Sequence, residues 1–306
     1  MTAPQTFARL REALAGVVAI PVTPFAGDGT IDERAHRALL HRLTGAGVRT
    51  LTPNGNTGEF YALTPEERRR VTELTADAVA GTAGGTVLAG VGHDLPTATA
   101  AARHARDCGA GMVMVHQPVH PYVSQDGWVD YHRAVADAVP ELGVVPYLRD
   151  PHLAGARLAE LGELCPNVIG VKYAVPDSAR FAAFARDAGL GRFVWIAGLA
   201  ELYAPSYFAC GATGFTSGLV NVAPGLALEL LAALRAGEYA AAMRIWERVR
   251  PFEELRAAER SADNVAVVKE ALASLGLCRR DVRAPSRALT GERRAEVAAI
   301  VARWAV

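Results

Sequence analysis

The chain has 306 residues, of which 51% are hydrophobic and 21% are charged, and its 32 basic and 32 acidic side chains give a formal net charge of zero. This composition excludes a disordered or collagen-like chain and is typical of a globular protein. A folded chain of this length buries roughly 75% of its unfolded surface, enough for one large α/β barrel or two ordinary domains. No basic run is longer than residues 68–70, so we expect neither a nucleic-acid partner nor binding to an anionic membrane surface.

The N-terminal segment lacks the features of a secretory signal, because charged residues interrupt its first apolar stretch within residues 1–15. No apolar run reaches the length of about 18 residues that a membrane-spanning helix needs. Four widely spaced cysteines, without a CxxC motif, are Cys108, Cys165, Cys210 and Cys278. We therefore expect a cytoplasmic protein with free thiols.

Eight short runs rich in β-branched residues recur along the chain, with helical segments between them. In chain order, the runs are Val17–Val22, Val48–Thr52, Thr86–Val91, Gly111–Val115, Gly143–Leu148, Val168–Lys172, Phe193–Ala197 and Thr213–Ser217. Most are continuously apolar rather than alternating, which is typical of strands buried on both faces of a parallel sheet.

Capping signals mark several of the intervening helices. Thr30 and Glu33 have the spacing of a capping box, and so do Thr64 and Glu67. Asp177 stands where it would cap the helix after the sixth strand.

Eight βα units within about 220 residues, without a flexible linker, predict an α/β fold, a (β/α)8 TIM barrel, rather than two doubly wound domains. We expect residues 1–223 to form the barrel and to carry the active site. The remaining sequence is rich in Ala, Leu, Glu and Arg, has a helical period and lacks strand signals. It predicts a C-terminal helical region, residues 224–306, packed on the barrel or on a neighbouring subunit.

Lys172 is one of only two lysines in a chain that otherwise uses arginine. It closes an apolar run, so it would lie in the mouth of the barrel, where loss of hydration lowers the pKa of its ammonium group. A neutral amine attacks a carbonyl, and the resulting iminium is an electron sink for cleavage of a neighbouring bond. The alternative is a lysine paired with a carboxylate at a strand end; the scarcity of lysine favours the catalytic interpretation.

Tyr147 ends the fifth run, one strand before Lys172, so the two side chains are expected to converge above the barrel axis. A phenol in this position can move a proton to and from a substrate. The alternative is a packed aromatic side chain whose hydroxyl bonds to the backbone.

Polar groups follow other strands at the same end of the barrel. The turn of Gly55, Asn56 and Thr57 offers backbone amides and side chains that can hold a carboxylate, or it is an ordinary βα turn. Further candidates for substrate binding at strand ends are His93, Gln117, Gly198 and Ser217.

A metal site is not expected, although His116 and His120 lie four residues apart. Pro118 interrupts any helix that would align them, and no acidic residue accompanies them. We therefore expect no metal and no other cofactor. Lys269, the second lysine, lies within a helical run away from every strand end and is expected to be structural.

The order of these motifs resembles the dihydrodipicolinate synthase / N-acetylneuraminate lyase family. The resemblance covers essentially the whole chain. It rests on residues 16–25 (GVVAIPVTPF), 55–60 (GNTGEF), 168–172 (VIGVK) and 214–217 (GFTS), and continues through 264–269 (NVAVVK) and 283–285 (RAP).

This resemblance implies a class I, Schiff-base (β/α)8 lyase that acts on pyruvate or a 2-oxo acid as a homotetramer or homodimer. Lys172 is then the Schiff-base residue and Tyr147 the proton shuttle. Gly55, Asn56 and Thr57 form the carboxylate-binding turn, with Thr57 also bonded to Tyr147 in a proton relay.

Two departures from the dihydrodipicolinate synthases bear on the substrate. Where those enzymes have two adjacent tyrosines, this chain has Tyr122 and Val123, so the second tyrosine of an inter-subunit relay is absent. His152 stands where they have an arginine for the aldehyde substrate's carboxylate, and Arg149 lies at a different offset.

These departures favour a lyase, either an aldolase or a dehydratase, whose substrate is a 2-oxo-3-deoxy sugar acid. His152 would then join the polar groups that contact substrate hydroxyls. The alternatives are a 4-hydroxy-tetrahydrodipicolinate synthase and a catalytically silent barrel that binds a 2-oxo acid.

Overall fold

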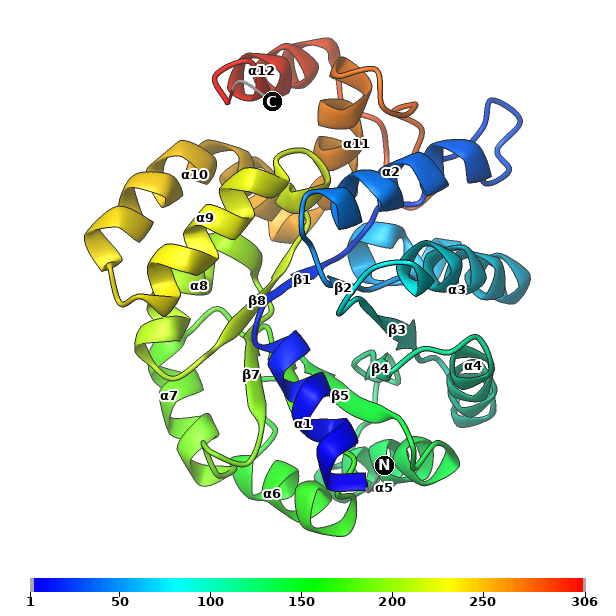
Figure 1. The fold of residues 1–306 in the computed structure, drawn as a ribbon, viewed down its shortest axis with the longest axis vertical. Coiled ribbons are helices and arrows are strands. Elements are labelled where there is room, and N and C mark those ends of the chain that lie inside the picture. Colours follow the sequence, from blue (N-terminus) through cyan, green and yellow to red (C-terminus); the bar gives the residue numbers. More distant parts are fainter. Residues whose placement is uncertain (1–2, 305–306) are drawn as a thin grey trace.

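The computed structural model describes residues 3–304 and shows a closed parallel barrel surrounded by helices (Figure 1). Its strands pair in sequence order, and β1 also pairs with β8, which closes the barrel. The strands are β1 (Val17–Ala19), β2 (Thr50–Leu51), β3 (Thr86–Val91), β4 (Met112–Val115), β5 (Gly143–Leu148), β6 (Gly170–Tyr173), β7 (Val194–Ala197) and β8 (Gly214–Ser217). The predicted (β/α)8 architecture is confirmed.

Helices follow the strands in alternation, and further helices complete the C-terminal region. They are α1 (Ala3–Leu14), α2 (Glu33–Gly45), α3 (Pro65–Ala80), α4 (Leu95–Asp107), α5 (Gln125–Ala138), α6 (Gly155–Leu164), α7 (Ser178–Asp187), α8 (Ala200–Ala209), α9 (Pro224–Arg235), α10 (Tyr239–Ser261), α11 (Asn264–Ser274) and α12 (Gly291–Val301). Three short 3-10 helices are η1 (Asn56–Gly58), η2 (Phe60–Ala62) and η3 (Leu219–Asn221).

The strand limits differ from the sequence prediction at both ends of the barrel: β2, β4, β6, β7 and β8 start one or two residues later than their predicted runs, and further differences lie at the mouth. β1 and β2 stop at Ala19 and Leu51, before their apolar runs end, because the backbone there leaves the sheet to build the loops of the mouth. β6 instead continues one residue beyond Lys172, to Tyr173.

Two of the three predicted helix caps are confirmed. Thr64 and Glu67 exchange both hydrogen bonds of a capping box, and Asp177 accepts a bond at the start of α7. The capping box at Thr30 was wrong, since Asp32 caps α2 and Thr30 bonds within the preceding loop. Asp32 takes the role because it directly precedes the first helical residue.

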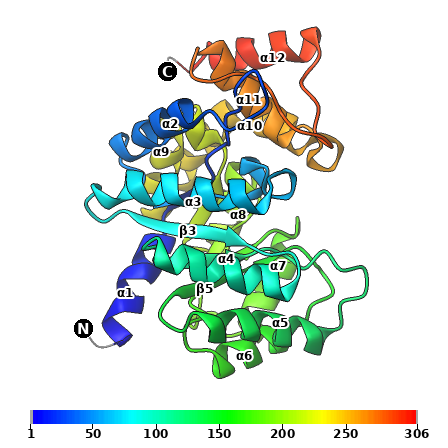
Figure 2. The ribbon, with the colours of Figure 1, turned by 90° about the vertical axis from the view of Figure 1, so that its right-hand side faces the viewer.

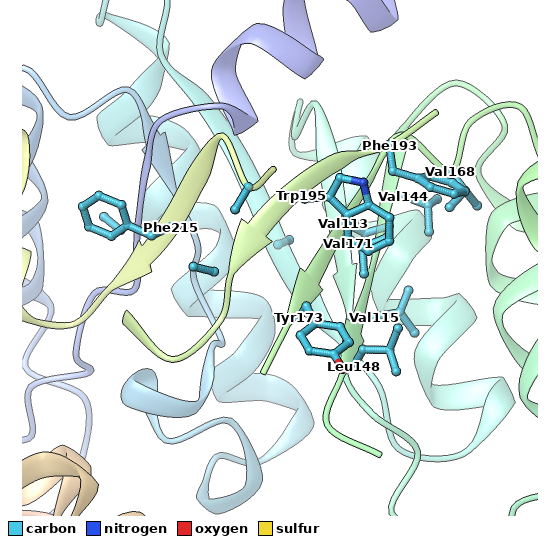
Figure 3. Close-up of a cluster of buried hydrophobic side chains, with 14 of the residues drawn as sticks. Val113, Val115, Val144, Leu148, Val168, Val171, Tyr173, Phe193, Trp195 and Phe215 are labelled. Carbon is cyan, nitrogen blue, oxygen red and sulfur yellow. The ribbon is translucent and has the colours of Figure 1, made fainter. Parts of the chain in front are cut away.

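The sheet has two apolar faces, as its continuous apolar strands predict. Outward side chains pack against the helices; for example, Tyr173 lies 5.2 Å from Phe181 of α7, measured between ring centroids. Figure 3 shows Tyr173 among outward-facing neighbours that include Val171 and Trp195. A separate inner cluster includes Leu14 of α1. The helix α1 lies at the end of the barrel from which the strands start (Figure 2).

The C-terminal helices pack on the barrel of the same chain. α9 follows β8 and shares the main hydrophobic core with the other barrel helices. A second core joins Phe252 of α10, Val268 of α11 and Val297 of α12 to Val222, in the loop after β8. No helix within residues 3–304 is long and apolar enough to cross a membrane.

Candidate active site

A cavity of about 280 Å³ lies at the carboxyl ends of the strands, where the reactive groups of (β/α)8 enzymes are found. Strand ends and their loops contribute Asn56, Thr57, Tyr147, Lys172, Gly198 and Thr216 to its lining. The C-terminal region contributes Glu253, Arg256 and Asn264. The structure therefore brings together the predicted lysine, tyrosine and turn, and adds groups from two C-terminal helices.

Lys172 is buried in the mouth of the barrel, with only 4% of its surface exposed. Its neighbours Val171 and Tyr173 face the outer core, so the alternation of side chains along β6 turns Lys172 inward. Burial lowers the pKa of the Lys172 ammonium from 10.5 to about 7, and the positive charges of Arg149 and Arg256 contribute. Near neutral pH, a large fraction of Lys172 is therefore the neutral amine that attacks a carbonyl.

Tyr147 stands directly beside Lys172, because the two residues are partners in the register of β5 and β6. The Lys172 Nζ atom lies 4.0 Å from the centroid of the Tyr147 ring. Burial raises the pKa of the phenol, so its hydroxyl keeps its proton at neutral pH. The predicted convergence of these two side chains is thus present.

The Tyr147 hydroxyl accepts a hydrogen bond from Nδ2 of Asn56 at 3.3 Å. The relay bond expected between Thr57 and Tyr147 is not among the hydrogen bonds formed within residues 3–304. Asn56 takes its place because its longer side chain reaches the phenol from the preceding position of the turn. The second polar atom of the amide, Oδ1, is buried without a partner in the described part of the chain.

The turn that begins at Gly55 packs tightly against the end of β1. A Cβ atom at Gly55 would lie 2.5 Å from Cγ2 of Ile20, and one at Gly58 would lie 2.9 Å from the carbonyl oxygen of Pro21. The Thr23 hydroxyl also donates to the Gly58 carbonyl at 2.8 Å. Only glycine fits these two positions, so the turn is fixed against the barrel wall.

A buried ion pair anchors the residue that follows this turn. Glu59 adopts a left-handed conformation with φ of 64° and pairs with Lys269 of α11, which is fully buried. The backbone N–H of Arg283 donates to the other Glu59 oxygen at 2.8 Å. Lys269 lies outside the cavity lining, in the structural position that the sequence suggested.

His116 supports the same turn through Asn54, the residue that precedes it. Its Nε2 atom donates to the carbonyl of Asn54 at 2.8 Å, and its ring stacks on Phe60 at 4.0 Å between centroids. Burial lowers the pKa of His116 to about 3, so the ring is neutral. The bond to a carbonyl requires the proton on Nε2.

Several other predicted contact residues lie outside the cavity lining. His93 stacks on Phe60 at 4.8 Å, Gln117 accepts a bond from the Arg149 backbone, and His152 is exposed. Ser217 is fully buried, where its hydroxyl donates to Glu201.

Gly198 does line the cavity. A Cβ there would lie 2.7 Å from the Tyr173 carbonyl and 3.0 Å from Cγ of Lys172. The absence of a side chain at this position leaves room for the stem of Lys172.

Arg256, Glu253 and Asn264 were not among the predicted site residues, although Asn264 opens the motif at residues 264–269 that carries part of the resemblance. They lie on α10 and α11, so a search restricted to strand ends passes over them. For Glu253 and Arg256, the only available signal was their spacing by three positions in a helix, which allows an ion pair but occurs on many helix surfaces. Within residues 3–304, no group of three or more His, Cys, Asp or Glu side chains is arranged to hold a metal ion.

A parallel (β/α)8 barrel with a buried lysine in its mouth has the architecture of the class I lyases, which form a Schiff base with a 2-oxo acid. The sequence pattern of the family described as "Dihydrodipicolinate synthetase family" matches residues 13–304. The chain belongs to this family.

Similar proteins fall into two activity groups. The chain is 33% identical over 290 residues to a probable 5-dehydro-4-deoxyglucarate dehydratase of Rhizobium rhizogenes, covering 94% of each chain. It is 35% identical over 289 residues to a 4-hydroxy-tetrahydrodipicolinate synthase of Phenylobacterium zucineum, covering 93% of this chain and 95% of the relative. The chain is therefore an enzyme, a Schiff-base lyase that acts on pyruvate or another 2-oxo acid.

The fold agrees with these relationships. The crystal structure of a dihydrodipicolinate synthase from Bacillus clausii superposes with a TM-score of 0.92 at 38% identity, covering 97% of this chain and 100% of that one.

Proposed function

We propose that this enzyme cleaves or dehydrates a 2-oxo-3-deoxy sugar acid through an imine on Lys172. Tyr147 acts as the proton shuttle, and Gly55, Asn56 and Thr57 hold the substrate's C1 carboxylate. The observation that carries the proposal is the buried Lys172 amine, which has a pKa of about 7 and lies 4.0 Å from the Tyr147 ring in a cavity at the barrel mouth.

The first stage is formation of the imine. The neutral Nζ of Lys172 attacks C2 of the substrate, and the carbonyl oxygen leaves as water after two protonations. Tyr147 is placed to deliver these protons, since its phenol is protonated at neutral pH and lies beside the amine. The C1 carboxylate accepts hydrogen bonds from the turn, where the Asn56 side chain lines the cavity.

The second stage uses the iminium as an electron sink. In a dehydratase, loss of a proton from C3 gives an enamine, and the enamine electrons expel the C4 hydroxyl group as water. In an aldolase, the same sink receives the electrons of the C3–C4 bond instead. Both reactions use the Lys172 and Tyr147 arrangement, and they differ in the bonds that break. The dehydratase breaks the C3–H and C4–O bonds, whereas the aldolase breaks the C3–C4 bond while the C4 hydroxyl loses its proton and becomes the carbonyl group of the released aldehyde.

Borohydride trapping tests the assignment of Lys172. Reduction in the presence of pyruvate, followed by peptide mass spectrometry, is expected to place the adduct on the peptide that contains Lys172. Lys172→Arg keeps the positive charge but cannot form the imine, so it is expected to abolish both trapping and turnover. An adduct on another residue, or none with any 2-oxo acid, would overturn the assignment.

Dihydrodipicolinate synthesis is the second candidate, supported by the Phenylobacterium relative at 35% identity. The chain has His152 at the position where dihydrodipicolinate synthases have an arginine for the aldehyde substrate's carboxylate. His152 is exposed and lies outside the cavity lining. We therefore expect poor condensation of pyruvate with aspartate semialdehyde. Measurement of both activities side by side distinguishes the two candidates, and a catalytically silent binding barrel would show neither.

The same proposal includes a homotetramer or homodimer in the cytoplasm. Val119 and Tyr122, in the loop after β4, are 65% and 86% exposed, which suits a contact with another subunit. The four cysteines are free thiols, the form that a reducing compartment maintains. Light scattering coupled to size-exclusion chromatography tests the assembly, and a monomer would refute it.

A further inference from the structure

Arg256 is a nearly buried guanidinium in the wall of the active-site cavity. Its side chain is 7% exposed, although arginine is rarely buried without a partner. Its Nε and Nη2 atoms both donate to Oδ1 of Asn264, at 3.1 and 2.8 Å, and Nη1 donates to Glu253. These contacts hold the guanidinium in one orientation.

The guanidinium still has donors to offer. Arginine carries five N–H groups, and the bonds to Asn264 and Glu253 use three of them. One N–H on each terminal nitrogen therefore has no protein partner within residues 3–304. Each of these N–H groups can donate to a carboxylate oxygen, and such a charge-assisted bond is stronger than one between neutral groups.

A glycine at the end of β8 makes room for this group. A Cβ atom at Gly218 would lie 2.2 Å from Nη2 of Arg256 and 2.7 Å from Cζ. Gly218 has φ of −96°, which other residues also adopt, so its need for glycine comes from the guanidinium and not from the backbone. Both residues line the cavity.

The charge of the cavity favours a dianion. Arg149, Arg256 and Arg260 border it, whereas Glu253 is the only carboxylate in its lining within the described residues. The nearby Glu201 does not add a full negative charge, because burial and the charge of Glu253 raise its pKa to about 8. A substrate with one carboxylate at the turn would leave this excess positive charge uncompensated.

Arg256 is also better suited to bind an anion than Arg149 and Arg260. Arg149 and Arg260 are exposed, so an anion would have to immobilise their side chains and displace their hydration. Arg256 is already oriented and desolvated, and it lines the same cavity as Lys172, so both residues can contact one bound molecule.

We propose that Arg256 binds the second carboxylate of a dicarboxylic 2-oxo-3-deoxy sugar acid whose C2 atom is bonded to Lys172. This inference rests on the proposed function and specifies its substrate class. A hydrogen bond to a charged group contributes about 1.5–3 kcal/mol, which corresponds to roughly 10- to 100-fold in kcat/KM.

The test compares a 2-oxo-3-deoxy hexarate with the hexonate of the same stereochemistry, which has a hydroxymethyl group in place of the second carboxylate. Arg256→Gln is expected to lower the hexarate-to-hexonate ratio of kcat/KM by roughly 10- to 100-fold. The double variant Glu253→Gln/Arg256→Gln removes both charges, which avoids leaving Glu253 buried without its partner. Gly218→Ala displaces the guanidinium and is also expected to lower the hexarate-to-hexonate ratio. Arg149→Gln removes another arginine of the cavity and is the matched control, for which a smaller change of the ratio is expected.

An unchanged ratio in both Arg256 variants would overturn the inference. If that unchanged ratio comes with an equal loss of kcat/KM for both substrates, Arg256 has a structural role. A larger change of the ratio in Arg149→Gln than in Arg256→Gln would also overturn the inference. Pyruvate has no second carboxylate, so failure of the wild-type enzyme to trap pyruvate would count against Lys172 and the proposed function alone. In that case, the role of Arg256 is tested separately by calorimetric titration with a hexarate that lacks the oxo group and so cannot form the imine. Arg256→Gln is expected to raise the Kd of this hexarate by roughly 10- to 100-fold.

Discussion

The lowered pKa of Lys172 makes a quantitative prediction about the pH dependence of imine formation. With a pKa of about 7, half of the Lys172 side chains are neutral at pH 7, whereas at the usual value of 10.5 only about 0.03% would be neutral. The initial rate of pyruvate trapping is therefore expected to rise about tenfold per pH unit below pH 7 and to level off above it. Cyanoborohydride, which survives in mild acid, allows trapping between pH 5.5 and 10.

The causes of the shift can be tested separately. Removing a nearby positive charge favours the ammonium form, so Arg149→Gln is expected to raise the pKa of Lys172 and move the midpoint to higher pH. Arg133→Gln changes an exposed arginine paired with Asp137 on α5 and serves as the control, with no movement of the midpoint. A trapping rate that climbs steadily to pH 10, or a midpoint that falls in Arg149→Gln, would refute the reasoning.

Three further predictions concern the support of the site and its chemistry. Lys269→Met leaves Glu59 buried without its cationic partner, so it is expected to lower the free energy of unfolding by about 3–5 kcal/mol and to raise KM for pyruvate. Urea unfolding measures the first effect and steady-state kinetics the second. The double variant Lys269→Met/Glu59→Gln should recover part of the stability. Gly198→Ala places a Cβ 3.0 Å from Cγ of Lys172 and is expected to slow the trapping of pyruvate on Lys172. Gly225→Ala is the control, because its Cβ would meet no other atom within 4 Å, and it should leave the trapping rate unchanged. Equal effects of the two substitutions would contradict the packing argument. Incubation with EDTA is expected to leave turnover unchanged, because the iminium supplies the electron sink, and a loss of activity that a divalent ion restores would disprove this.

The sequence predicted the barrel well because the pattern of a parallel sheet is strong and local. Apolar runs such as Thr86–Val91 and Gly143–Leu148 match β3 and β5 to the residue. Predictions failed where the choice between two local arrangements depends on a single position. Thr30 and Asp32 both precede the same helix, and their spacing alone does not show which of them caps it.

The site was predicted only in part, for a geometric reason. Lys172, Tyr147 and Gly198 lie at strand ends and line the cavity, as predicted. A position near the mouth does not, however, determine which way a side chain points. Ser217 is at the end of β8 and bonds to Glu201 of α8 outside the cavity lining. Arg256 reaches the cavity only because α10 and α11 fold over the mouth, a contact between segments far apart in the sequence.

The C-terminal helices therefore contribute to the site as well as to the core. α10 supplies Arg256 to one wall of the cavity, and α11 supplies Lys269, which fixes Glu59 directly after the turn on another wall. α11 also contacts the turn itself, at η1. A shift of α11 relative to the barrel would thus displace both the turn and Asn264, which orients Arg256. Since the two proposed carboxylate sites depend on the same helix, the spacing between them is fixed by how α11 packs, and this packing sets the length of substrate that both sites can hold at once.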